Sequence, residues 1–97
     1  MFKNPYYVYI IEGSDGNFYT GMTKSIRRRL NEHNGRGRWR NPKAWTFKRM
    51  PIFLVHLEKH PDKKSAHTRE LELKKFTPEE KKTLIASTSK DQILSAI

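Results

Sequence analysis

Cysteine is absent from this 97-residue sequence. A chain without thiols forms no disulfide bond, offers no thiolate to a metal ion and has no cysteine nucleophile, which excludes several classes of enzyme. Long apolar runs are also absent, so no membrane-spanning helix is predicted, and the first residues do not follow the pattern of a secretory signal. We therefore expect a cytoplasmic protein that does not insert into membranes.

Acidic residues are scarce relative to basic ones. The 10 aspartates and glutamates stand against 20 lysines and arginines, which gives a formal net charge of +10 and a pI near 10.1. Such a charge favours polyanions, with nucleic acid first and anionic membranes or acidic proteins second. The length predicts one small domain with a modest core, without a separate DNA-recognition domain.

A hairpin is predicted near the start of the chain. Aromatic and β-branched residues from Tyr7 onward are typical of a strand, and turn residues around Asp15-Gly16 follow. That pair tolerates the positive φ angles of a tight hairpin turn. We therefore expect Tyr9 and Tyr19 to lie on neighbouring antiparallel strands, with their phenol groups on one face.

A helix is predicted after this hairpin, with Ser25 as its N-cap. The residues Ile26, Arg29, Leu30 and His33 follow the spacing of a single helical stripe. Arg29 thus falls on the inward face, where it either binds an anion or, equally well on spacing alone, extends along the sheet edge or pairs with a glutamate. His33 by itself is typical of a boundary residue.

Half of the basic side chains lie in one stretch that contains a single acid, Glu32. They are Lys24, Arg27, Arg28, Arg29, Arg36, Arg38, Arg40, Lys43, Lys48 and Arg49. Residues 35–45 combine turn residues with alternating arginines and lack a periodic apolar face, which predicts a loop. This loop either wraps a phosphate backbone, with Trp39 stacking on an exposed base, or is simply a solvated basic loop. Trp45 is expected to pack back onto the domain.

The second half predicts one strand and then helices. An apolar run over 51–58 predicts a third strand, expected to be central and the most buried. In a helix over 63–76, Glu70 falls toward the core and Glu72 toward solvent. Glu70 is then either an internal ion-pair partner, with Arg29 as one candidate, or part of a site.

Two further helices are indicated by capping patterns. Thr77-Pro78-Glu79-Glu80 has the threonine, proline and glutamate of a capping box, and this helix should end before Ser87. The same logic predicts a short terminal helix from Ser89. These carboxylates are interpreted as cap residues, not metal ligands.

Two tripeptides and their spacing resemble the signature of the GIY-YIG nuclease family. Tyr7-Val8-Tyr9 stands where the family has Gly-Ile-Tyr, and Tyr19-Thr20-Gly21 stands where it has Tyr-Ile-Gly. Ten residues separate Tyr9 from Tyr19 and also Tyr19 from Arg29, with His33 four residues further on. The resemblance covers about residues 6–84. It is strongest to small stand-alone bacterial members similar to the nuclease domain of the excision-repair protein UvrC.

The resemblance implies a fold and a set of roles. The fold is α+β, a three-stranded antiparallel sheet flanked by helices, in a single domain over 1–97 with its core at about 6–84. Glu70 would bind one Mg²⁺ or Mn²⁺ ion, and Arg29 would hold the scissile phosphate. Tyr19 or His33 would be the general base, with Tyr9 orienting the water or the phosphate.

The chain departs from the family pattern at two places. Tyr7 occupies the position of the leading glycine, and no asparagine follows Asn41, although some members carry a downstream asparagine near the site. The first departure also occurs in small relatives and is not expected to abolish activity. The second bears on the complete catalytic geometry.

The resulting hypothesis is a metal-dependent endonuclease that hydrolyses DNA, in a setting such as DNA repair. No base-reading helix is indicated, so selection by DNA structure is expected in place of selection by sequence. RNA stays open as a substrate, as does a protein partner for targeting. The alternatives are a non-catalytic nucleic-acid-binding module on the same fold and a basic protein-interaction adaptor.

Overall fold

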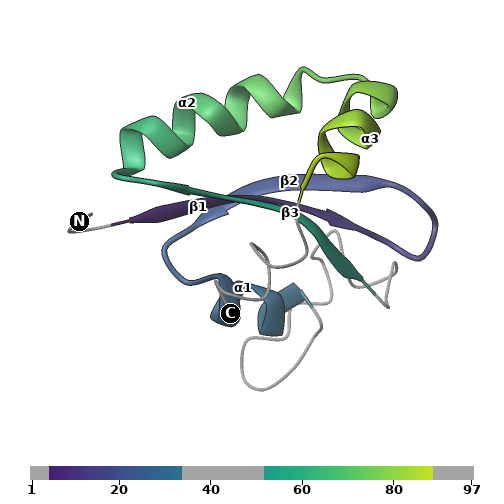
Figure 1. The fold of residues 1–97 in the computed structure, drawn as a ribbon. Coiled ribbons are helices and arrows are strands. Elements are labelled where there is room, and N and C mark those ends of the chain that lie inside the picture. Colours follow the sequence, from purple (N-terminus) through teal and green to yellow (C-terminus); the bar gives the residue numbers. More distant parts are fainter. Residues whose placement is uncertain (1–4, 34–51, 89–97) are drawn as a thin grey trace.

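The computed structural model describes residues 5–33 and 52–88, with side chains over 5–29 and 52–88. Its elements are β1 (Tyr6–Glu12), β2 (Phe18–Thr23), α1 (Ile26–His33), β3 (Phe53–His60), α2 (Lys63–Lys74) and α3 (Pro78–Ala86). The strands form one antiparallel sheet in the order β2-β1-β3. Helices lie on both sides of it, α1 on one face and α2 with α3 on the other (Figure 1). The predicted α+β fold is confirmed.

The prediction that the third strand is central was wrong. β1 occupies the centre and pairs with both other strands, whereas β3 is an edge strand of the described sheet. Phe53 at the start of β3 is 55% exposed, so the apolar run is only partly buried. An apolar run reports side chains that pack on a face; it carries no information on how many neighbours the backbone pairs with.

Two apolar clusters form the core, one on each face of β1. Tyr9 and Ile11 pack with Ile26 of α1 on the first face. Val8 and Ile10 alternate with them and pack on the opposite face, under Ala66 and Leu73 of α2. Each side of β1 is thus covered by its own helix layer. Within the described residues, no helix is both long and apolar enough to span a bilayer.

The hairpin turn differs in detail from the predicted one. Gly13 and Asn17 are joined by a backbone hydrogen bond, and three residues form the loop between them. Among the described residues, Gly16 has the single positive φ, at 82°, so Asp15 does not share that conformation. Asp15 instead accepts hydrogen bonds from the backbone and side-chain amides of Asn17. The turn therefore depends on one left-handed glycine and one aspartate side chain.

Helix starts follow the predicted capping chemistry. Ser25 Oγ accepts from the Arg28 amide at the start of α1, and Asp62 caps α2 through the Ser65 amide at 2.8 Å. At α3 the complete capping box of Thr77 and Glu80 is present, with a proline in the first turn. The predicted helix from Ser89 and the predicted loop over 35–45 lie outside the described residues.

Candidate active site

Tyr9 and Tyr19 lie together on the face of the sheet that α1 covers. Tyr9 on β1 pairs with Gly21 on β2. The ring centroids of Tyr9 and Tyr19 are 6.4 Å apart, with an angle of 41° between the ring planes. A Cβ atom at Gly21 would lie 2.5 Å from the Tyr9 hydroxyl and 2.7 Å from its Cζ. The glycine therefore leaves room for the Tyr9 ring to lie across β2. The predicted juxtaposition of the two tyrosines is confirmed.

The two phenol groups differ in accessibility. Tyr9 is only 1% exposed, whereas Tyr19 is half-buried. Tyr19 can therefore meet a substrate directly in this structure, and Tyr9 is placed to support it from beneath. The nearly complete burial of Tyr9 was not predicted, because the sequence of a tyrosine-rich strand does not show which ring will lie over a glycine of the next strand.

Arg29 lies on the same side of the sheet as the tyrosines. It belongs to α1, which packs on this face through Ile26, a residue that is 3% exposed. Arg29 is half-buried, whereas Arg27 and Arg28 are exposed. The predicted inward position of Arg29 is therefore confirmed. His33 is the last residue of α1, and its side chain lies outside the described part, so its role stays a prediction.

Glu70 faces the sheet from α2, on the opposite side from the tyrosines. It is 9% exposed and lies on the buried stripe of Ala66 and Leu73, while Glu72 is exposed, as predicted. Within the described part of the chain, Glu70 forms its ion pairs inside its own helix. His67 Nδ1 lies at 3.6 Å and Lys74 Nζ at 3.7 Å from the Glu70 carboxylate.

The strand β2 separates these two groups of residues. The tyrosines and Arg29 lie toward α1, and Glu70 lies under α2, which packs against both β1 and β2. A ligand that contacts both groups therefore has to reach both faces of the sheet.

The basic residues predicted to bind nucleic acid are only partly described. Lys24, Arg27 and Arg28 are exposed around the start of α1. Arg27 and Arg28 belong to the helix that covers the tyrosines, whereas Lys24 Nζ lies 5.8 Å from the ring centroid of Tyr6, which packs on the α2 face of the sheet. The other predicted contacts lie outside the described residues; they are Arg36, Arg38, Trp39, Arg40, Lys43, Lys48 and Arg49.

A second cluster of charged side chains was missed in the sequence. Glu58 on β3 contacts His56 Nε2 at 2.7 Å and His60 Nε2 at 3.0 Å. Arg69 of α2 donates to the same carboxylate through Nε and Nη2 at 3.0 to 3.2 Å. His56 also contacts Thr88, after α3. The cluster therefore joins β3 to the helices that cover it.

The pKa of Glu58 reflects this pairing. Burial alone would raise it, but hydrogen bonds from His56, Arg69 and His60 outweigh burial and lower the pKa from its ordinary 4.5 to about 2. The visible signal in the sequence was the alternation of His56, Glu58 and His60, which places all three on one strand face. Arg69 comes from another element, so its approach could not be read from that pattern.

A divalent metal has one candidate carboxylate at the predicted site. Within the two described ranges, no three side chains of the His, Asp or Glu types gather as a set of ligands. Glu70 supplies one hard oxygen donor group, and its neighbours His67 and Lys74 have side chains that are 59% and 50% exposed. Those side chains can rotate away from the carboxylate. The donor set therefore fits an ion such as Mg²⁺, which keeps most of its waters and binds through few protein groups.

Comparison with known proteins finds a family model and relatives that match most of this chain. The family model described as the GIY-YIG catalytic domain matches residues 5–83. The UPF0213 protein of Syntrophus aciditrophicus is 44% identical over 85 residues, which are 88% of this chain and 92% of the relative. UPF0213 protein SAG0778 of Streptococcus agalactiae is 38% identical over 93 residues, 95% of this chain and 100% of the relative.

A solved structure is also similar to this one. It is the solution NMR structure of the UPF0213 protein BH0048 from Bacillus halodurans, 35% identical in sequence. The match covers 84% of this chain and 83% of that chain, with a TM-score of 0.53. The three-stranded sheet and its helices are therefore an arrangement shared with a relative.

Proposed function

The chain belongs to the GIY-YIG family of catalytic domains, a nuclease family, and on that premise we propose that it is an endonuclease that hydrolyses DNA. The observation that carries the proposal is the packing of Tyr9 and Tyr19 on one face, with Arg29 on the helix that covers that face. These three residues occupy the motif positions and share one side of the sheet.

The roles follow from charge and accessibility. Phosphodiester hydrolysis needs a base for the attacking water and a cation for the charge that develops on the phosphate. Arg29 is half-buried on the helix that covers the tyrosines, and its planar guanidinium suits phosphate oxygens. Tyr19 or His33 serves as the base, and the buried Tyr9 holds the ring of Tyr19 in position.

Glu70 is proposed to hold the divalent ion, Mg²⁺ or Mn²⁺. When bound, such an ion supplies positive charge to the phosphate and to the leaving oxygen. Glu70 is largely buried on α2, and the exposed His67 and Lys74 lie at 3.6 and 3.7 Å from its carboxylate. Replacement of these two loose partners needs only rotation of surface side chains.

DNA is the proposed substrate, recognised by its structure. Arg27 and Arg28 are exposed on α1, the helix that covers the tyrosines, and Lys24 is exposed just before it, so these cations can contact phosphates. No described element has the form of a helix that carries base-reading side chains into a groove, so these contacts favour shape over sequence. A cytoplasmic setting and a role in DNA repair are part of the same proposal.

A second candidate function is supported by a specific observation. Tyr9 is almost fully buried, and Glu70 lies across the sheet from both tyrosines. A fold that binds nucleic acid without cutting it is compatible with that separation. The two candidates differ in their dependence on Glu70, because loss of this carboxylate ends cleavage in the first case and leaves binding intact in both.

The test is cleavage of supercoiled plasmid and of branched DNA with Mg²⁺ or Mn²⁺. Wild type is compared with Arg29→Ala, and Arg28→Ala serves as the matched control because it removes the same charge from an exposed neighbour. The proposal expects at least a 100-fold loss for Arg29→Ala, as for other groups that stabilise transition-state charge, and a minor loss for Arg28→Ala. Binding without cleavage by the wild type, with either metal, would establish the binding module instead.

A further inference from the structure

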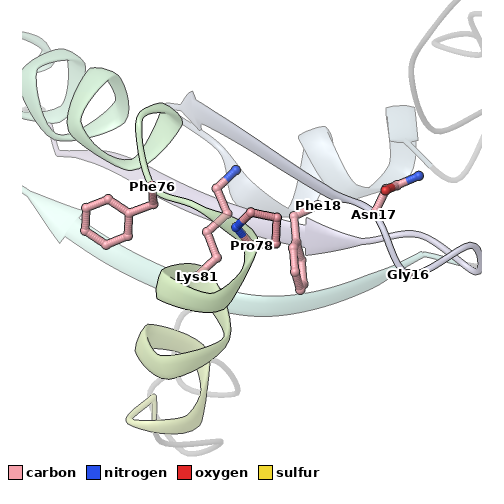
Figure 2. A pocket seen from close by; sticks show the side chains of 6 residues that line it. All are labelled: Gly16, Asn17, Phe18, Phe76, Pro78 and Lys81. Atoms are coloured by element: carbon pink, nitrogen blue, oxygen red, sulfur yellow. The ribbon is translucent and has the colours of Figure 1, made fainter.

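A hollow lies between the β1–β2 turn and the start of α3, on the α2 side of the sheet. Its volume is about 300 Å³, and its lining consists of Gly16, Asn17, Phe18, Phe76, Pro78 and Lys81. Figure 2 shows Phe18 approaching from β2, with Phe76, Pro78 and Lys81 coming from the α2–α3 connection and α3. Tyr9 and Tyr19 face the other side of the sheet, so this hollow is separate from their site.

The walls of the hollow are aromatic and apolar. Phe18 and Phe76 are half-buried, because each packs by one part against the cluster of Val8 and Ile10. Their remaining surface lines the hollow together with the ring of Pro78. Rings that are fixed by packing and exposed in part form a ready platform for a flat aromatic ligand, since little conformational freedom is lost on stacking.

The polar groups at the hollow indicate an anionic ligand. Lys81 is half-buried, and burial lowers its pKa. Over the described residues, no carboxylate is found in an ion pair with Lys81, whereas Arg69 and Lys74 each have one. At the rim, Asn17 Nδ2 donates to Asp15, which leaves the side-chain oxygen Oδ1 of Asn17 to accept from a ligand. A cation, an acceptor and flat apolar walls together match a nucleotide.

We propose that this hollow binds one unpaired nucleobase, with Lys81 on the adjoining phosphate. The inference rests on the proposed function only in that the chain binds nucleic acid, and it requires no cleavage. A base in a duplex is stacked on both sides and cannot enter, so the hollow selects single-stranded or distorted nucleic acid. The net charge of +10 supplies the attraction for any nucleic acid, and the hollow adds the preference.

The experiment compares two labelled probes by fluorescence anisotropy at fixed salt. One is oligothymidylate, and the other is an abasic strand of the same length and charge. Phe18→Leu keeps an apolar side chain but removes the stacking face of the ring from β2. Phe76→Leu does the same for the ring from the α2–α3 connection, which also has Arg69 Cζ at 5.9 Å from its centroid. Lys81→Gln removes the charge, with Lys82→Gln as the matched control on an exposed neighbour. Thermal unfolding verifies that each variant is folded.

Wild type is expected to bind oligothymidylate more tightly than the abasic strand. Each leucine variant should weaken oligothymidylate binding by about 5- to 20-fold, the range of one lost stacking contact, with little change for the abasic strand. Lys81→Gln should weaken both probes more than Lys82→Gln does. Equal oligothymidylate affinity of wild type and both folded leucine variants would overturn the inference.

The two proposals fail in different ways. Glu70→Gln should end cleavage while it preserves the preference for oligothymidylate, because Glu70 does not line the hollow. A protein that cuts DNA but shows no effect of Phe18→Leu on binding would retain the proposed nuclease function and lose the hollow. A protein that never cuts, yet loses its preference in Phe18→Leu, would retain the hollow and lose the nuclease function.

Discussion

Glu58 and Glu70 are two carboxylates of the same fold with opposite surroundings. The Glu58 side chain is 20% exposed and accepts from three cationic or imidazole groups, at distances from 2.7 to 3.2 Å. The Glu70 side chain is more buried, at 12% exposed, yet its partners lie at 3.6 and 3.7 Å and are themselves half exposed or more. Burial alone therefore does not separate a structural carboxylate from one that can bind a ligand.

The location of each glutamate agrees with that difference. Glu58 lies on β3 and joins the sheet to α2 and, through His56, to the end of α3. Glu70 lies on the inner face of α2, and the motif tyrosines lie on the other face of the sheet. Glu58 is thus held by bonds between elements, whereas among the described residues Glu70 has its charged contacts within its own helix.

Acid should remove the contribution of Glu58 to the free energy of unfolding. Its pKa is lowered from 4.5 to about 2, so the folded state holds fewer protons than the unfolded state between these values. The stabilisation is complete above pH 4.5 and is lost as the pH falls toward 2; it amounts to about 3 kcal/mol at most. Urea unfolding followed from pH 6 to pH 2 measures this loss. A free energy of unfolding that does not change over this pH range would show that Glu58 does not stabilise the fold.

Replacement of Glu58 should lower stability at neutral pH. Glu58→Gln leaves Arg69 with its single contact to Glu72 and should cost about 2 kcal/mol in free energy of unfolding. Glu72→Gln is the matched control, because Glu72 is exposed and holds Arg69 through one contact at 3.3 Å; it should cost under about 0.5 kcal/mol. Equal losses of free energy of unfolding for the two substitutions, measured with urea at pH 7, would show that Glu58 stabilises the fold no more than the exposed Glu72 does.

A side chain at position 21 of β2 should destabilise the fold. Gly21→Ala brings a Cβ atom to 2.5 Å from the Tyr9 hydroxyl, so the buried ring must move, at a cost of about 1 to 2 kcal/mol. In a Tyr9→Phe background the closest atom is gone, and the same substitution should cost less. A double-mutant cycle by thermal unfolding measures the coupling energy between positions 9 and 21. A coupling energy of zero would contradict the contact between Gly21 and the Tyr9 ring.

The smallest effect is expected at Thr20. Its Oγ1 atom is buried and has no hydrogen-bond partner among the described residues, and the residue is 3% exposed. Thr20→Val should therefore stabilise the fold by about 1 kcal/mol. Thr23→Val is the control, since Thr23 Oγ1 accepts from the Ser25 amide, and it should destabilise. Opposite signs in thermal unfolding would confirm that the edge near the motif leaves a polar group unsatisfied.

Much of this architecture could be predicted from local patterns. The inward Glu70, the outward Glu72 and the capping box at Thr77 follow from helical periodicity and from side-chain to backbone hydrogen bonds within four residues. The position of β3 at an edge and the Arg69 to Glu58 contact could not be predicted in the same way. Both depend on which distant elements meet, and 11 residues separate Arg69 from Glu58.

The most direct test of the contrast between the two glutamates is Mn²⁺ broadening of backbone amide signals in two-dimensional NMR. The account predicts that low concentrations of Mn²⁺ broaden amides around Glu70 first, that Glu70→Gln abolishes this effect, and that amides around Glu58 are spared. Broadening centred on Glu58, or equal broadening at the exposed Glu72, would contradict the account, because the loosely held carboxylate would then not be the preferred ligand.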